Sequence, residues 1–216
     1  MSRRENWTIK EGELFNIKVP FSAIGTEAQQ MFENSIKRSI EGMVERLAKP
    51  VLYTREILHD KTRLLGQYRM LKLDDESDSE TLSITDGSVL KGEAIGSLEF
   101  KSGYLLIFLV TLKNYDETEL SLNNAIERFY LDSWGSSYIW NAINHIKASI
   151  MENLEDRGYE YSRFLFPGQN GLSLENQRAV FSMLEPEKLS VSLNESCLMN
   201  PLKSYTSFLI CRSRQE

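Results

Sequence analysis

The chain has 216 residues, of which 41% are hydrophobic and 26% charged, with only 5 prolines and 12 glycines. This balance excludes a disordered, collagen-like or low-complexity chain, and a chain of this length buries roughly 70% of its unfolded surface, so it needs no disulfide or metal to fold. The formal net charge of −6 argues against a nucleic-acid-binding protein, because neutralising phosphates requires a basic face. Two cysteines, Cys197 and Cys211, are too few for a disulfide framework and are interpreted as reduced core thiols.

The sequence predicts a cytoplasmic protein with no membrane segment. Its first residues are polar and lack the apolar stretch of a secretory signal. The most apolar run, Tyr104 to Leu112, is much shorter than the roughly 20 residues that a membrane-spanning helix needs. Such a short apolar run is typical of a strand that is buried on both faces.

The first predicted element is an amphipathic helix over residues 27–48. Thr26 and Gln29 form a capping box before it, and Pro50 is expected to close its far end. Its apolar residues recur at the spacing of one helix face. We assign this helix to a helical N-terminal segment, about residues 1–60, of a single domain that spans residues 1–216.

The middle of the chain is expected to form strands. Short strands are predicted near Gly66–Leu73 and Thr81–Thr85, followed by a turn at Asp86-Gly87 and a buried strand over Leu105–Leu112. The acidic run between the two short strands, residues 74–80, could suggest a calcium loop, but it lacks the glycine that an EF-hand loop requires. We interpret it as a solvated hairpin loop.

The second half of the chain mixes helices and strands without regular alternation, which favours an α+β fold. A long helical segment is predicted from Glu117 to Glu155, with a break near Gly135 and an end at Gly158. The remaining elements, in chain order, are a strand over Tyr159–Phe164, a Pro167-Gly168 turn, a helix over Ser173–Leu184 capped by Ser173, and strands over Leu189–Asn194 and Ser204–Cys211.

Familiar catalytic motifs are missing from the sequence. His59 and His145 lie in separate segments without a histidine partner at metal-ligand spacing, so no metal site is expected. The sequence has no phosphate-binding P-loop and no dinucleotide-binding glycine pattern. The segment from Trp134 to Tyr138 lacks the second glycine of a nucleophile elbow. The residues alone assign no enzyme class and no catalytic residue.

Two stretches, Phe108–Ile143 and Phe166–Cys211, resemble the activation domain of cobalamin-dependent methionine synthase in its free-standing bacterial form. The shared features, in chain order, are Val110-Thr111-Leu112, Asp132 with Gly135-Ser136, Pro167-Gly168, Leu193-Asn194-Glu195-Ser196, Met199 and Pro201. The resemblance is strongest over residues 108–211. It implies an α+β fold with a twisted antiparallel sheet edged by helices.

The resemblance implies a module that binds S-adenosylmethionine and presents it to an oxidised cobalamin. The cobalamin would lie on a partner, either a cobalamin-binding methionine synthase or another corrinoid protein, and flavodoxin would supply the electron. The chain would then be an accessory part of a methyltransferase in methionine biosynthesis.

The resemblance also implies the ligand-binding residues, which are Arg163, Pro167, Gly168, Gln169 and Glu195. The sulfonium and ammonium of S-adenosylmethionine favour nearby carboxylates, and its carboxylate favours an arginine or backbone donors. Its methyl group must stay open to the cobalt, which requires a shallow groove. A Pro-Gly turn suits such a groove, because glycine lets the backbone approach the ligand closely.

Three positions depart from the family pattern of arginine, two residues, proline, glycine and tyrosine, with a glutamate on the preceding helix. Phe164 stands at the arginine position, and Arg163, one residue earlier, would point to the other face of a strand. Gln169 replaces the tyrosine and Trp140 the glutamate. These departures favour an alternative, a non-catalytic homologue that has lost S-adenosylmethionine binding and acts as a docking or regulatory subunit or binds another small molecule.

Glu195, Asp132 and Glu160 each have more than one interpretation. Glu195 could orient the site or face the sulfonium end of the ligand, or it could be a strand-end carboxylate paired with a backbone donor, and Ser196 is interpreted as structural. Asp132 is expected to pack its helix rather than contact ligand. Glu160 could form a charged pair with Arg163 near the ligand, although surface pairing is the default.

Overall fold

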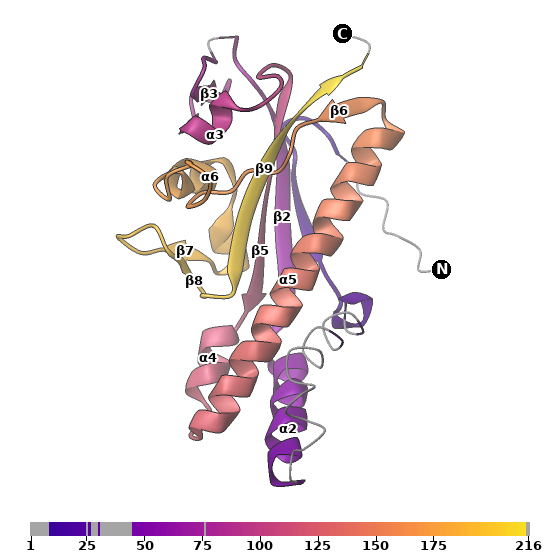
Figure 1. The fold of residues 1–216 in the computed structure, drawn as a ribbon, viewed down its shortest axis with the longest axis vertical. Coiled ribbons are helices and arrows are strands. Elements are labelled where there is room, and N and C mark those ends of the chain that lie inside the picture. Colours follow the sequence, from indigo (N-terminus) through magenta and orange to yellow (C-terminus); the bar gives the residue numbers. More distant parts are fainter. Residues whose placement is uncertain (1–8, 25, 27–29, 31–44, 76, 215–216) are drawn as a thin grey trace.

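The computed structural model describes residues 9–24, 26, 30, 45–75 and 77–214 and is built around one large sheet (Figure 1). The sheet has five strands in the order β1-β2-β5-β9-β6, and every neighbouring pair is antiparallel. The strands are β1 (Leu14–Lys18), β2 (Arg63–Lys72), β5 (Tyr104–Lys113), β6 (Tyr159–Tyr161) and β9 (Ser204–Ser213). The predicted α+β fold with an antiparallel sheet is confirmed.

The central strand β5 separates two hydrophobic cores. Its residues alternate between them, with Leu106 and Phe108 in one core and Leu105 and Ile107 in the other. Alternation follows from the two-residue period of a strand, and both faces are apolar because both are covered. The predicted buried strand is therefore confirmed.

Long helices cover one face of the sheet. α5 (Ala125–Asp156) runs diagonally across it, and α2 (Glu45–Lys61) packs beside the first half of α5 (Figure 1). The Asn124 side chain caps α5 by accepting a hydrogen bond from the backbone N–H of Ile126. The short helix α4 (Tyr115–Leu120) joins β5 to α5.

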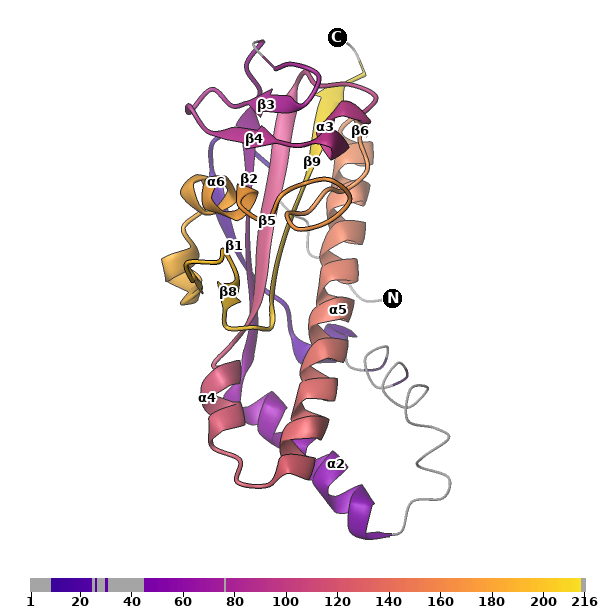
Figure 2. The same ribbon diagram turned by 60° about the vertical axis from the view of Figure 1, so that its left-hand side comes forward.

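Small elements cover the opposite face (Figure 2). They are the two-stranded pairs β3 (Thr81–Ser83) with β4 (Val89–Lys91) and β7 (Ser192–Leu193) with β8 (Met199–Asn200), the helices α3 (Glu93–Gly96) and α6 (Asn176–Met183), and the 3-10 helix η1 (Pro186–Leu189). Asp86-Gly87 forms the turn between β3 and β4, as predicted. The acidic run joins β2 to β3, where Asp78 accepts a hydrogen bond from the N–H of Glu80.

The predicted break in the long helix was placed wrongly. Residues 121–124 separate α4 from α5, and Gly135 lies within the continuous α5. A Cβ at Gly135 would lie 2.8 Å from the Tyr115 ring, so this glycine lets α4 pack against α5. Gly158 does follow the end of α5, with the positive φ of 75° that is typical there.

The N-terminal predictions need two corrections. Almost all of the predicted helix over residues 27–48 lies outside the described residues, but Pro50 does not end a helix, because α2 continues through it to Lys61. The segment expected to be helical also contains β1, which pairs with β2. β1 is a short edge strand, and its stability comes from this pairing rather than from a local sequence signal.

Several predicted bounds in the C-terminal half also differ. The strand after Gly158 ends at Tyr161, and α6 begins at Asn176, three residues after the predicted cap Ser173. The predicted strand over residues 189–194 is reduced to β7, because Pro186 begins a 3-10 helix just before it. Cys197 and Cys211 are both free and buried, as predicted, and burial raises the pKa of Cys211 to about 12. No described helix is long and apolar enough to cross a membrane.

His59 connects α2 to α5 in a partly buried contact. Its Nε2 lies 2.5 Å from the hydroxyl oxygen of Tyr138, and the Phe21 ring stacks on its imidazole at 4.6 Å. Burial lowers the pKa of His59 below 6.5, the nearby Arg55 lowers it further, and Asp60 opposes the shift. The folded chain therefore disfavours the imidazolium.

This shift predicts a pH-dependent stability. The unfolded chain binds a proton at His59 more readily than the folded chain, so the free energy of unfolding should fall as the pH drops through 6.5. Urea unfolding between about pH 7.5 and about pH 5.5 should show a steeper fall for the wild type than for His59→Gln. Equal slopes for the two proteins would contradict the prediction.

Candidate functional site

Four of the five predicted ligand residues, Arg163, Pro167, Gly168 and Gln169, lie in the segment that follows β6 beside β9. The backbone of this segment bonds to β9: the Leu165 N–H donates to the Phe208 carbonyl at 2.8 Å, and the Phe208 N–H donates to the Leu165 carbonyl at 2.9 Å. Pro167 and Gly168 come next, and the N–H of Gly168 donates to the Leu172 carbonyl at 2.8 Å. Gly168 has φ +91°, which favours glycine, so the residue type fits the turn.

Arg163 and Phe164 point in different directions from this segment. The guanidinium of Arg163 donates to the hydroxyl of Ser97, beside α3, at 2.5 Å. The Phe164 ring instead packs edge-on against Phe108, in the core covered by α5, at 6.0 Å. The Arg163 guanidinium thus does not reach the side of the segment on which Phe164 lies, where the family pattern has an arginine.

An aromatic cluster surrounds a lysine beside the Pro-Gly turn. Lys147 of α5 places its Nζ 4.9 Å from the ring centroid of Phe164, 5.6 Å from that of Phe166 and 5.3 Å from that of Tyr205. Its ammonium also donates a hydrogen bond to the Tyr205 hydroxyl at 3.2 Å. We call these four residues the Lys147 cluster. Burial lowers the pKa of Lys147 and raises that of Tyr205 to about 12.

Glu195 lies in the connection between β7 and β8. Its backbone carbonyl accepts a hydrogen bond from Arg178 of α6 at 2.9 Å, and its side chain is exposed. The connection is tightened by Asn194, whose side chain accepts from the N–H of Leu198 at 2.9 Å. These contacts tie Glu195 to α6 rather than to the Pro-Gly turn or the Lys147 cluster. Gln169 is exposed on the turn itself.

Asp132 belongs to a polar contact that fixes α5 to the start of β9. Its carboxylate lies 2.6 Å from the Lys203 ammonium, which also donates to the Ser136 hydroxyl at 2.8 Å. The Lys203 ammonium lies 5.5 Å from the centre of the Tyr115 ring. Asp132, Gly135 and Ser136 thus hold elements together, as the packing interpretation of Asp132 predicts.

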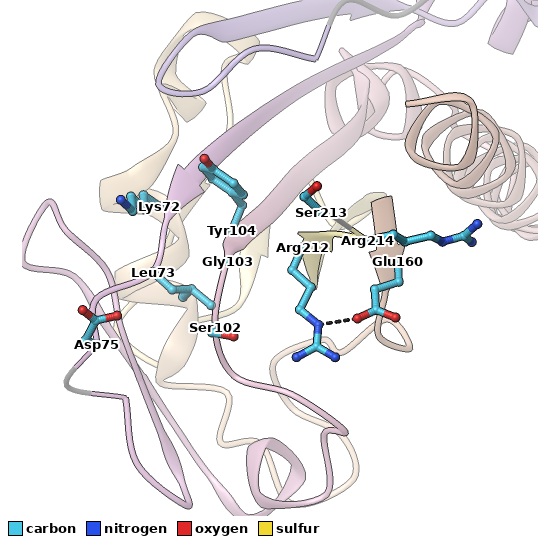
Figure 3. Close-up of a pocket in the computed structure, with 10 residues that line it drawn as sticks. All are labelled: Lys72, Leu73, Asp75, Ser102, Gly103, Tyr104, Glu160, Arg212, Ser213 and Arg214. Atoms are coloured by element: carbon cyan, nitrogen blue, oxygen red, sulfur yellow. Dashed lines mark hydrogen bonds and ion pairs between the residues drawn. The ribbon is translucent and has the colours of Figure 1, made fainter. Parts of the chain in front are cut away.

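The alternative charged pair between Glu160 and Arg163 is wrong. Glu160 instead pairs with Arg212, its cross-strand partner on β9, and the Arg212 guanidinium lies 4.3 Å from the centre of the Phe100 ring. This pair lines a polar cavity of about 530 Å³ at the end of the sheet (Figure 3). Lys72 and Asp75 line the same cavity. None of the five predicted ligand residues lines it.

The structure therefore brings together only part of the predicted site. Pro167 and Gly168 lie beside Phe164, whereas Arg163 and Glu195 are held by α3 and α6. Sequence analysis missed Lys147. One signal was available, because Lys147 lies seven residues after Trp140 and so falls on the same face of α5.

Comparisons with known proteins support one fold. No protein-family model matches the chain, and no curated protein matches it. Among solved structures, the crystal structure of the MetH reactivation domain bound to AdoHcy superimposes with a TM-score of 0.69, covering 94% of this chain and 79% of that chain. The chain has the reactivation-domain fold.

The likeness is one of architecture. The two chains share 12% sequence identity, so the comparison establishes the reactivation-domain fold and leaves ligand and partner to be argued from the site. The resemblance seen in the sequence is confirmed at this level. The reactivation-domain fold here carries Phe164, Gln169 and Trp140 at the three positions that depart from the family pattern.

Proposed function

We propose that this chain is an S-adenosylmethionine-binding module that supports reductive methylation of a cobalamin held by a separate protein. The observation that carries the proposal is the reactivation-domain fold over 94% of the chain, in a relative that binds AdoHcy. AdoHcy, S-adenosylhomocysteine, is what remains when S-adenosylmethionine gives up its methyl group. The partner would be a cobalamin-binding methionine synthase or another corrinoid protein.

The site beside the Pro-Gly turn has suitable chemistry for such a ligand. The rings of Phe164, Phe166 and Tyr205 offer flat apolar surfaces beside which an adenine could lie. Gly168 presents backbone without a side chain. The chain would bind and orient the methyl donor, whereas the cobalt chemistry would belong to the partner and the electron to flavodoxin.

A second candidate function is a non-catalytic docking or regulatory subunit for a corrinoid protein. The observation that favours it is the position of Arg163, which donates to Ser97 while Phe164 occupies the family's arginine position. This candidate predicts that a corrinoid protein is recovered with the chain in a pull-down, whether or not the chain binds S-adenosylmethionine. A clean negative with the purified corrinoid protein would exclude it.

Calorimetric titration tests the first proposal. S-adenosylmethionine and S-adenosylhomocysteine should both bind saturably, with micromolar dissociation constants. Gly168→Val should lower the affinities for both ligands at least about tenfold. A β-branched residue is strained at φ +91°, and its Cβ would lie 3.2 Å from the Leu174 side chain. The matched control is Gly12→Val, a glycine of positive φ with open space around its Cβ position and far from the turn in sequence.

The outcomes separate the two candidates. Binding by the wild type and by Gly12→Val, with loss in Gly168→Val, supports the ligand site at the turn. No saturable heat with the wild type excludes the S-adenosylmethionine-binding module and leaves the docking subunit. Equal affinities for Gly168→Val and the wild type would place the ligand elsewhere on the chain.

A further inference from the structure

The ammonium of Lys147 lies half-buried without a carboxylate partner. Among the described lysines, ion pairs are formed by Lys10, Lys188 and Lys203 with nearby acidic residues. Among the described residues, no ion pair includes Lys147. Its polar contact is the hydrogen bond to Tyr205. The three surrounding rings stabilise a cation but accept no conventional hydrogen bond.

This arrangement leaves N–H donors of Lys147 available to a ligand. An ammonium has three N–H donors, and one of them reaches the Tyr205 hydroxyl. Partial burial strengthens the attraction of the others to an anion, because less water competes for them. The strongest partner for such a group is a carboxylate or another anion, through a charge-assisted hydrogen bond.

Lys147 lies beside the segment that carries the Pro-Gly turn. Two residues of its cluster, Phe164 and Phe166, immediately precede the Pro167-Gly168 turn on the same segment. The side chain at position 164 is apolar, so the positive charge at this place comes from α5 instead. The cluster thus combines aromatic faces with one unpaired cation next to exposed backbone.

We propose that Lys147 binds the carboxylate of the amino-acid part of the ligand and thereby determines specificity for amino-acid-bearing nucleosides. This inference rests on the proposed function and assigns the group that recognises one end of the ligand. Lys147 is a binding residue in this role and takes no part in methyl transfer.

The test compares two ligands that differ in that end. S-adenosylhomocysteine carries the amino-acid carboxylate, and 5′-methylthioadenosine keeps the nucleoside and the thioether without it. Lys147→Met should lower the affinity for S-adenosylhomocysteine about 10- to 100-fold, measured by calorimetry. This is the range for losing a hydrogen bond to a charged group. Binding of 5′-methylthioadenosine should stay unchanged, and Lys147→Arg should retain most of the affinity for S-adenosylhomocysteine.

Two controls make the result specific. Lys72→Met removes a lysine from the polar cavity at the sheet end, and it should leave both affinities unchanged (Figure 3). Circular dichroism and thermal unfolding establish that each variant is folded, and Lys147→Gln replaces Lys147→Met if the latter is not.

Each outcome decides the question. Unchanged binding of S-adenosylhomocysteine to Lys147→Met, or equal losses for both ligands, overturns the role of Lys147 while the proposed function stands. A lower affinity of Lys72→Met for S-adenosylhomocysteine would instead assign the carboxylate of the ligand to the cavity at the end of the sheet. Absence of binding of either ligand to the wild type overturns the proposed function, and the role of Lys147 with it.

Discussion

Trp134→Ala is expected to lower the free energy of unfolding by about 3–5 kcal/mol, the range for deleting a large aromatic side chain from a core. Trp134 is 2% exposed and belongs to the core beneath α5. Its indole N–H donates to the backbone carbonyl of Val51 in α2 at 3.1 Å, and its ring lies 6.2 Å from that of Tyr138. The substitution removes the packing and one of the hydrogen bonds to the Val51 carbonyl, which keeps the bond from the Thr54 hydroxyl at 3.0 Å.

Urea unfolding with matched variants separates these contributions. Trp134→Phe keeps most of the ring but loses the bond to Val51, and it should cost about 1–3 kcal/mol. Trp140→Ala is the control on the same helix, because Trp140 is 51% exposed and its removal should change stability by less than about 0.5 kcal/mol. Similar losses at the two tryptophans would contradict the assignment of Trp134 to the contact between α5 and α2.

Gly103→Ala is expected to cost about 3 kcal/mol or more, through strain and a backbone clash together. Gly103 precedes β5 and has φ +98°. A Cβ there would lie 2.5 Å from the Cys211 carbonyl oxygen and 2.8 Å from the Cβ of Arg212, so β9 could not keep its position beside β5. The Gly103 carbonyl also accepts a hydrogen bond from Leu73 at 2.9 Å.

The control for Gly103 is a glycine whose backbone is similar but whose surroundings are open. Gly87, in the turn between β3 and β4, has φ +87° and nothing within 4 Å of its Cβ position. Gly87→Ala should therefore cost only the conformational term, about 1–2 kcal/mol. Thermal or urea unfolding of the two variants gives the comparison, and equal losses would show that the clash with β9 is relieved without cost.

The sheet could be predicted where the local sequence is decisive. The run from Tyr104 to Leu112 is apolar at every position but one, which requires cover on both faces, and the structure provides it with α5 on one side and α6 and η1 on the other. The strand predicted over Ser204–Cys211 is also present and extends two residues further. Turn residues such as Asp86-Gly87 also act locally.

The errors arose where distant contacts decide the structure. Gly135 looks like a helix break in the sequence, but it makes room for the Tyr115 ring of α4, a neighbour in space that periodicity does not show. Pro50 looks like a helix end, yet α2 continues through it because its other residues pack on α5. Packing overrides local propensity in both cases.

The candidate site divides in the same way. The Pro167-Gly168 turn follows from residue types alone, because glycine suits the positive φ that the turn needs. The Lys147 cluster does not, since its members come from α5, the segment after β6 and the start of β9. One unusual pair, Phe164 beside Arg163, was visible in the sequence, but only the fold shows that Arg163 bonds to Ser97.

The order of strands in the sheet has a consequence for synthesis on the ribosome. β9 lies between β5 and β6, although it is translated after both. Until residue 213 has emerged from the exit tunnel, β5 has an unpaired edge along most of its length, and β6 has no strand to join. From the emergence of β5 until β9 follows it, the nascent chain thus displays an apolar strand edge, which makes it prone to aggregation when translation stalls in this interval.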